Sequence, residues 1–413
     1  FTTPLILAEE LPNHWMLLAY LLILDSGVLI ISFTKNWRSF SLGALFGSFG
    51  LLVIFLDRFE PLNPGIFFSQ LSVTTTFLLF FVGTIPPIVF RNRSSTNIDL
   101  SMIIANATLF FGASYMILEE EHRVWMGAFA LSLAMFYGVS AYLVLLKRLF
   151  YPKLSMALSG IALVLLTIAF PLHISNQDTW ITIAWAIEGL VLLFLSIKLK
   201  LFPLRVFSLI VFASMVFRLI FVDSQIELTT LFQPLLNERV LAFFVGILTT
   251  GIAARLLLSN QHILKEKEIL LPPFFVILST ALTLSILSIE MMMYFKHQIL
   301  LSRELLTTGI WSSQGVEVLE NIGGLALTIL WGIFGSLIFS VGILRNWKLV
   351  RLGGLAFLTL PVLKLFLYDS FALSQGYRVA AFITLGIILL FGGFLFQKYQ
   401  AAIKEFLFEE NAS

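Results

Sequence analysis

The sequence predicts an all-α protein that crosses a membrane about thirteen times. Hydrophobic residues make up 59% of the 413 residues, charged residues make up only 12%, and the mean hydropathy is +0.96. Soluble domains contain about 45–50% apolar and about 25% charged residues. This chain therefore has too few polar side chains to cover a surface that faces water. Its apolar runs are long, and in lipid such a run satisfies its backbone hydrogen bonds as a helix.

The predicted spans follow from the lengths of these runs, because about 20 helical residues cross the hydrocarbon core of a bilayer. In chain order the spans are residues 14–34, 40–57, 67–90, 99–118, 124–146, 154–172, 179–197, 203–222, 240–258, 271–294, 323–344, 350–368 and 377–397.

Glycines at 43, 47, 50, 353 and 354 permit close contact between helices. Prolines at 86, 87 and 361 are expected to kink the helices that contain them.

Basic residues divide the connecting loops into two groups. The loops near residues 35–38, 91–93, 147–153, 198–205, 255–267, 345–351 and 398–404 are rich in Lys and Arg, and all fall on one side of a thirteen-span count. Cytoplasmic loops carry such an excess. The sequence therefore predicts that the N-terminus of this chain lies outside and its C-terminus in the cytoplasm. The opposite loops are acidic, which indicates either simple depletion of basic residues or a vestibule that attracts a cationic ligand.

An internal repeat joins two parts of the chain. Residues 182–224 align with residues 328–370 at a constant offset of 146, without a gap, and NERVLAF (237–243) then resembles GYRVAAF (376–382). Spans 7–9 and 11–13 are therefore predicted to be parallel copies of one three-span unit, separated by span 10. The matching pairs are Thr182 and Thr328, Trp185 and Trp331, Gly189 and Gly335, Arg205 and Arg351, Arg218 and Lys364, and Asp223 and Asp369.

The predicted organisation has five parts. Residues 1–178 hold the first six spans, and residues 179–294 hold repeat A with span 10. Residues 295–322 form an outer loop, either a plain ordered loop or a surface helix. Residues 323–397 hold repeat B, and residues 398–413 form an amphipathic cytoplasmic tail.

Each repeat ends its second span with a basic residue and, five residues later, an aspartate: Arg218 with Asp223, and Lys364 with Asp369. Five residues turn an α-helix by about 140°, so we expect poor contact within one helix. Partners are expected from another span or from lipid headgroups. The natural candidates are Arg239 and Arg378, which begin the following spans. The cluster either marks the membrane edge and holds helix hairpins together, or binds a ligand.

Three carboxyl groups lie deeper within apolar runs: Asp25, Glu188 and Glu290. A charge at the bilayer centre costs about 2.5–3.5 kcal/mol on insertion scales, so such residues are candidate functional sites. The alternative for Asp25 and Glu188 is a protonated or hydrogen-bonded group that bridges helices. For Glu188 the candidate partners are Thr182 and Trp185. The counterpart of Glu188 is Phe334, so this carboxyl is not needed to build the repeat.

The sequence gives little support to an enzyme, a metal site or a cofactor site. It contains no cysteine, its five histidines fall in loops or at span ends, and it lacks HExxH, Walker A and GxGxxG motifs. We therefore expect no catalytic residue, no metal and no cofactor. The net charge of +2 is too small to indicate a nucleic-acid partner.

Three segments carry a resemblance to a family, at residues 13–40, 169–200 and 363–400, with the patterns WAIEG and LYD…YRV. They resemble the family of domain of unknown function 2339, whose members are multi-spanning bacterial membrane proteins. The resemblance implies a bacterial inner membrane and implies no reaction or catalytic residues. Members are commonly longer, so a portion before Phe1 is expected.

Three functions stay open. The first is transport or flipping of a lipid-linked or amphipathic envelope component. The second is a non-catalytic scaffold subunit of an envelope complex, with lipids and other membrane proteins as partners. The third is a transferase for lipid-linked substrates, with Asp57, Glu60 or Asp369 as base.

Overall fold

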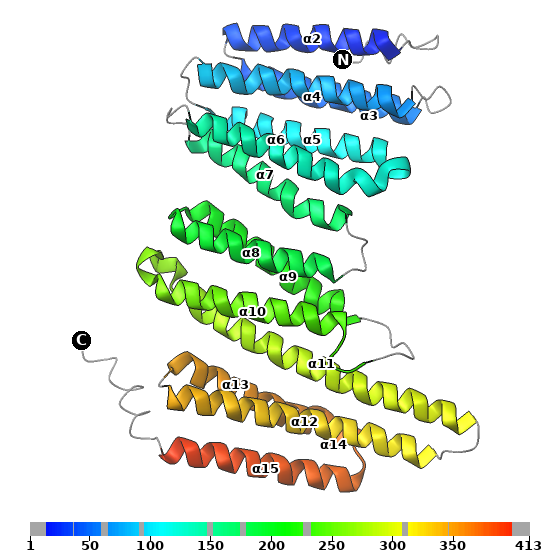
Figure 1. Ribbon diagram of the computed structural model, residues 1–413, viewed down its shortest axis with the longest axis vertical. Coiled ribbons are helices and arrows are strands. Elements are labelled where there is room, and N and C mark those ends of the chain that lie inside the picture. Colours follow the sequence, from blue (N-terminus) through cyan, green and yellow to red (C-terminus); the bar gives the residue numbers. More distant parts are fainter. Residues whose placement is uncertain are drawn as a thin grey trace. The chain divides into compact units, whose positions relative to one another are not determined.

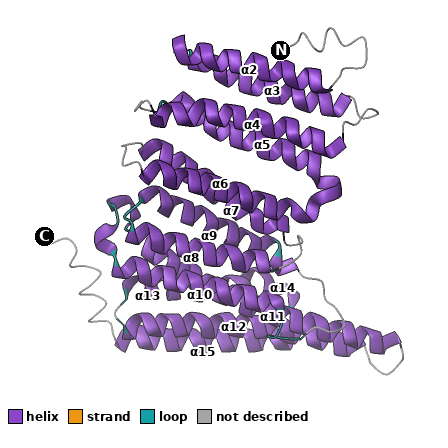
Figure 2. Cartoon of the chain, turned by 45° about the horizontal axis from the view of Figure 1, so that its top comes forward, coloured by secondary structure: helices purple, strands orange, loops and turns teal. Residues whose placement is uncertain are grey.

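The computed structural model describes residues 14–35, 37–58, 65–90, 95–146, 152–173, 179–225, 233–307, 313–345 and 347–398. These residues are almost entirely helical and include no strand (Figures 1 and 2). The long helices are α2 (His14–Lys35), α3 (Arg38–Arg58), α4 (Gly65–Phe90), α5 (Asn97–His122), α6 (Met126–Leu146), α7 (Pro152–His173), α8 (Trp180–Lys198), α9 (Phe202–Phe221), α10 (Glu238–Ser259), α11 (Leu271–Thr307), α12 (Ser313–Leu344), α13 (Lys348–Lys364) and α15 (Gln375–Lys398). The short turns are η2 (Arg123–Trp125), η3 (Asp223–Gln225), η4 (Gln261–Ile263), η5 (Glu266–Glu268), η6 (Leu365–Asp369) and α14 (Ser370–Ala372).

Every predicted span corresponds to one of these long helices, so the predicted fold class is confirmed. Within the described residues, eleven helices are long and apolar enough to cross a membrane, and α3 contributes a shorter apolar stretch, Arg38–Ile54. Large apolar side chains lie exposed along many of them, as expected where lipid replaces water as the solvent. The side of the membrane on which each end lies stays a prediction.

The chain divides into two compact units, Phe1–Asp178 and Thr179–Ser413. In the first unit, α2 packs on α3 and α4, α3 and α4 both pack on α5, and α5 packs on α6 and α7. Aromatic rings fill its core: Phe77 stacks on Phe110 with 4.2 Å between ring centroids, and Tyr137 is fully buried beside them. The unit is thus a layered helical bundle with one continuous hydrophobic core.

The second unit contains two three-helix groups with the same packing. In repeat A (α8, α9 and α10) the first helix contacts both of the others, and in repeat B (α12, α13 and α15) the first helix again contacts both of the others. Helix α11 lies between the repeats, against α10 on one side and α12 on the other (Figure 1). This arrangement fits the repeat that the sequence predicts.

Matching glycines set the contact between the first two helices of each repeat. A Cβ atom at Gly189 would lie 3.2 Å from the ring of Phe212, and a Cβ atom at Gly335 would lie 2.8 Å from the backbone nitrogen of Leu358. Phe212 and Leu358 are themselves 146 residues apart, like the two glycines. The two hairpins are therefore built around the same close approach.

The two repeats differ in how well their interiors are filled. Repeat A and α11 share one continuous cluster of buried apolar side chains. In repeat B the buried apolar residues form two separate small clusters, one around Leu365 and one around Phe339. Among the described side chains, the apolar core of repeat B is thus less continuous than that of repeat A.

Most of the predicted outer segment at residues 295–322 is helical, which differs from a plain ordered loop. Helix α11 continues through residue 307 and is 37 residues long, and α12 begins at residue 313 and is 32 residues long. At 1.5 Å per residue they measure about 55 Å and about 48 Å, against about 30 Å for the hydrocarbon core. Their ends therefore extend beyond it as a helical hairpin. Residues 308–312, and all of the predicted tail except Lys398, lie outside the described residues.

The glycines expected to support close packing do not all do so. Apart from the local backbone of its own helix, nothing lies within 4 Å of a Cβ atom built at Gly43, Gly50 or Gly353, so the expectation is wrong at these positions. At Gly354 it is confirmed, because a Cβ atom would lie 2.4 Å from the backbone nitrogen of Phe339. Only backbone movement can relieve a clash with backbone atoms.

Replacing Gly354 by alanine is expected to destabilise repeat B by about 1–3 kcal/mol, because it overpacks the contact between α12 and α13. The neighbouring Gly353→Ala variant is a matched control that adds the same methyl group in open space. Thermal unfolding of both variants in detergent, followed by tryptophan fluorescence, measures the difference. Equal melting temperatures for the two variants would contradict this packing.

Candidate functional site

A threonine–aspartate hydrogen bond closes one end of each repeat. The hydroxyl of Thr182 donates to Asp223 Oδ2 at 2.5 Å, and the hydroxyl of Thr328 donates to Asp369 Oδ2 at 2.6 Å. The partners are 41 residues apart in both cases, and all four side chains are buried. Each bond ties the first helix of its repeat to the end of the second. We call these two bonds the Thr–Asp latches.

In each repeat the aspartate of the latch also contacts the basic residue five positions before it. Lys364 Nζ donates to Asp369 Oδ1 at 2.6 Å, to the Thr328 hydroxyl at 2.8 Å and to the Gly324 carbonyl at 2.9 Å. The three donors of the ammonium group are thus all used. In repeat A the contact is looser, with Arg218 Nε 3.6 Å from Asp223 Oδ1.

These pairs correct the expectation that residues five apart are poor partners, which assumed an unbroken α-helix. The backbone changes after Lys364 into the π-helical turn η6 (Leu365–Asp369). A π-helix bonds residue i to residue i+5, so positions five apart come to the same side. In repeat A the α-helix stops at Phe221 and Asp223 begins a 3₁₀ turn. At both aspartates the backbone is therefore not a regular α-helix.

The partners proposed for the two aspartates are occupied elsewhere. Arg239 Nη1 lies 3.5 Å from Glu290 Oε1 on α11, and both side chains are buried. Arg378 is exposed, and its Nε donates to the carbonyl of Leu373 at 2.7 Å. The sequence-based pairing of these arginines with Asp223 and Asp369 is thus replaced by other contacts.

Glu290 of α11 forms hydrogen bonds with the residues at the start of α10 in repeat A. Its carboxylate accepts hydrogen bonds from the backbone N–H of Leu235 at 2.9 Å and from the side-chain amide of Asn237 at 3.1 Å, beside Arg239. The corresponding N–H in repeat B is that of Ser374, from the alignment of residues 237–243 with 376–382. It donates to the neutral amide oxygen of Asn321 at 2.8 Å. One helix start thus holds a carboxylate, and the other holds an amide.

A cavity of about 500 Å³ opens beside the latch of repeat B, between α11, α12 and the segment from η6 to Ser374. This volume is within the range of about 300–1,000 Å³ that is usual for ligand sites. Its wall combines apolar and charged groups. The lining residues are Met292, Phe295, Lys296, Ile299, Glu317, Leu319, Glu320, Asn321, Gly323, Gly324, Leu327, Lys364, Tyr368, Ala372, Leu373 and Ser374.

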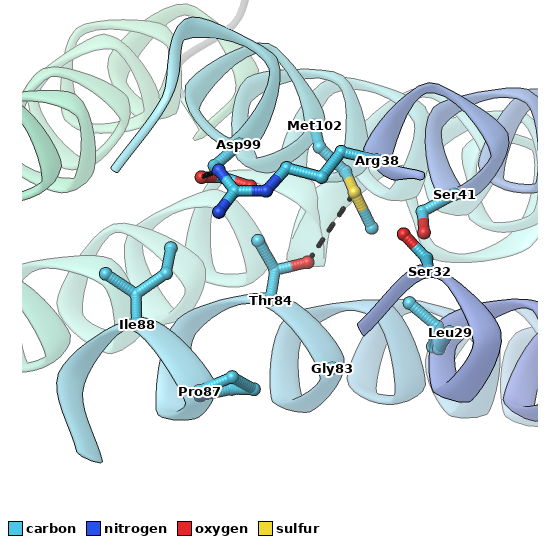
Figure 3. Close-up of a pocket in the computed structure, with 10 residues that line it drawn as sticks. All are labelled: Leu29, Ser32, Arg38, Ser41, Gly83, Thr84, Pro87, Ile88, Asp99 and Met102. Carbon is cyan, nitrogen blue, oxygen red and sulfur yellow. Dashed lines mark hydrogen bonds and ion pairs between the residues drawn. The ribbon is translucent and has the colours of Figure 1, made fainter. Parts of the chain in front are cut away.

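A smaller cavity of about 50 Å³ lies in the first unit (Figure 3). Arg38 forms an ion pair with Asp99, whose carboxylate also accepts from the hydroxyl of Thr96 at 2.9 Å. Ser32, Ser41 and Thr84 line the same space. Its size suits one or two water molecules rather than a larger ligand.

Two of the three deep carboxyl groups, Asp25 and Glu188, are buried and do not line the larger cavity. The hydroxyl of Ser48 is 2.6 Å from Asp25 Oδ2 and 2.8 Å from Asp25 Oδ1, and Asp25 is fully buried. Glu188 is buried, but the hydroxyl of its candidate partner Thr182 donates to Asp223 instead. Neither carboxyl group lines the 500 Å³ cavity.

The sequence reasoning missed the ion pair between Arg205 and Glu268, whose side chains are both buried and 2.6 Å apart. The sequence does not single out Glu268, because it lies in a charged loop whose residues are typical of a solvated surface. The position of Arg205 in the repeat was the only available signal. Among the described residues, no three His, Asp or Glu side chains are placed to hold a metal ion.

Comparison with known proteins identifies a family but no function. A family model described as predicted membrane protein (DUF2339) matches residues 1–230 and 196–399. No curated protein and no solved structure matches the chain.

Replacing Asp369 by asparagine leaves the Lys364 ammonium, whose side chain is only 11% exposed, without its counter-charge. Removing one partner of a buried pair typically costs about 3–5 kcal/mol, so a large fall in the melting temperature is expected. The double variant Lys364→Met, Asp369→Asn is expected to recover part of the loss.

The matched change Asp223→Asn in repeat A is expected to cost less, because the Arg218 contact is longer. Scanning fluorimetry of the four proteins in one detergent measures this. A double variant that is less stable than Asp369→Asn alone would contradict the pairing.

Proposed function

The chain belongs to the DUF2339 family of predicted membrane proteins, and from this premise we propose that it binds an amphipathic component of the cell envelope and moves it between leaflets. The observation that carries the proposal is the 500 Å³ cavity of repeat B. Its wall offers Phe295, Ile299 and Leu327 to an acyl chain, and Lys296, Glu317 and Asn321 to a polar head. A ligand with both kinds of surface fits this wall better than a purely polar or a purely apolar one.

The height of the cavity along α11 supports the same ligand class. About 20 helical residues cross the hydrocarbon core, so a crossing that starts near Leu271 ends close to residue 290. The cavity residues Met292–Ile299 follow directly after that point. The site would therefore lie at the level of lipid headgroups, on the face that the distribution of basic loops predicts to be outside.

A static scaffold is the second candidate function. The buried pairs Arg205–Glu268 and Arg239–Glu290 support it, because each joins two segments that are far apart in sequence. Such pairs suit a bundle that stays closed along its interior. They also favour a ligand path at the side of the bundle, where the cavity lies, over a path through its core.

The transferase alternative loses one of its candidate bases. Asp369 is fully buried and is bound by Thr328 and Lys364, so it is not available to a substrate. The side chains of Asp57 and Glu60 lie outside the described part of the chain.

The proposed function predicts that the protein, reconstituted in liposomes, accelerates the movement of a fluorescent phospholipid between leaflets. Dithionite quenching of an NBD-labelled lipid measures the rate. The Ala372→Trp variant, which fills the cavity from an exposed position, is expected to lower the rate at least tenfold with an unchanged melting temperature.

Ala356→Trp is the matched control, because Ala356 is also exposed but does not line the cavity. It is expected to leave the rate unchanged. A wild-type rate equal to that of protein-free liposomes would rule out lipid movement and favour the scaffold.

A further inference from the structure

We propose that Asp25 is a proton-binding site within the first unit, and that protons reach it from the small cavity at Arg38 and Asp99, past the side chain of Leu29. Three features of the molecule support this role: Asp25 lacks a counter-charge, its contacts with Ser48 fit the protonated acid, and the cavity begins close to it. The site lies in the first unit, so its role does not depend on the function proposed for the cavity beside repeat B.

Asp25 differs from the other buried aspartates in its partner. Asp99, Asp223 and Asp369 are buried, and each contacts an arginine or a lysine. Among the described residues Asp25 has no such partner; it is 0% exposed, and its hydrogen-bond partner is the hydroxyl of Ser48 on α3. A carboxylate in an apolar interior without a counter-charge is strongly disfavoured, and such a group takes up a proton instead.

The helices packed around Asp25 place their charged residues far from it. Helix α2 packs on α3 and α4, and α4 contains no titratable residue. On α2, Tyr20 is turned by about 140° from Asp25 around the helix. The charged residues and histidines of α2 and α3 all lie toward the helix ends, at His14, Lys35, Arg38, Asp57 and Arg58. Each is nine or more residues along its helix from Asp25 or Ser48, which is about 13 Å or more at the helical rise.

The contacts between Asp25 and Ser48 fit the protonated acid. Ser48 Oγ lies 2.6 Å from Asp25 Oδ2 and 2.8 Å from Asp25 Oδ1. A serine hydroxyl carries one proton, so it cannot fully satisfy two contacts this short with an ionised carboxylate. In the protonated acid, the carboxyl O–H donates to Ser48 Oγ while the Ser48 O–H donates to the other carboxyl oxygen. Proton uptake thus turns both contacts into hydrogen bonds.

The small cavity begins one helical turn from Asp25. Leu29 follows Asp25 by four residues and lines the cavity, so about 6 Å of helical rise separates them. Ser32 and Ser41 line the same space, and so does Arg38 at the start of α3 (Figure 3). Hydroxyl and charged groups therefore continue from the helix end toward Leu29, and water can occupy a polar space of this size.

Leu29 separates this polar space from Asp25. Its half-buried side chain packs on α4 at Gly83, where a Cβ atom would lie 2.8 Å from Leu29 Cδ1. A change of the Leu29 rotamer would join Asp25 to the cavity. The basic loops predict that this end of α2 faces the cytoplasm, which makes the cytoplasm the source of the proton.

Infrared spectroscopy of the full chain in liposomes tests the site, because a protonated carboxyl group absorbs apart from carboxylates. We expect the difference between the wild type and Asp25→Asn to show one carboxylic C=O band at neutral pH. The band is expected to fall as the pH is raised and to shift in D₂O. Ser48→Ala keeps the carboxyl group and removes one hydrogen bond, so it is expected to move the band to higher frequency, which identifies the band even if Asp25→Asn does not fold.

Two matched variants test the route. Leu29→Ala removes the side chain between Asp25 and the cavity, and is expected to speed up the D₂O shift of the band about tenfold. Leu21→Ala makes the same change one turn away on the other side of Asp25, where Leu21 is fully buried. It is expected to leave the rate of the shift close to that of the wild type.

Three results would overturn the proposal. Absence of the band at every pH at which the fold is kept would show a carboxylate at Asp25. A band that neither falls with pH nor shifts in D₂O would make Asp25 a fixed structural acid that exchanges no proton. A faster shift in Leu21→Ala than in Leu29→Ala would place the proton entry on the opposite side from the cavity.

Discussion

The constraint on which this structure depends is the cost of a carboxylate in a low-dielectric interior. A buried charge is tolerated where hydrogen bonds and an opposite charge compensate it. Asp223 and Asp369 meet this condition in the same way, through a threonine on the first helix and a basic residue five positions before the aspartate. The backbone departs from the α-helix at both places to make this possible. The latch thus fixes how the first two helices of each repeat meet.

On this shared frame the repeats have diverged at the third helix. Repeat A is closed by Glu290 from α11 and shares one continuous core with that helix. Repeat B keeps the latch, but its described buried apolar residues form two separate clusters, and a cavity of about 500 Å³ adjoins it. Helix α11 contacts both repeats. It supplies Glu290 to repeat A and lines the cavity beside repeat B. We interpret repeat A as the structural copy and repeat B as the copy that carries the binding function.

The sequence predicts the positions of the helices and the repeat well, because hydropathy reports lipid contact directly and the ungapped alignment keeps Thr182 and Asp223 in register with Thr328 and Asp369. It does not predict the Lys364–Asp369 contact, because a π-helical turn has no pattern that distinguishes it from an α-helix. It also misses the pairing of Arg239 with Glu290, since residues 51 positions apart leave no periodic signal in one sequence. For residues 295–322 the mixed polar and apolar residues are compatible with a loop, a surface helix and the projecting ends of two long helices, so the sequence does not distinguish them.

The most direct test of this account is an electron cryo-microscopy map of the full chain in lipid nanodiscs. The account predicts elongated density in the cavity between α11, α12 and the segment 365–374, and no such density beside Glu290 in repeat A. It also predicts the π-helical turn at Leu365–Asp369, with Lys364 on Asp369. A cavity filled by protein side chains, or a regular α-helix there with Lys364 turned away, would contradict it.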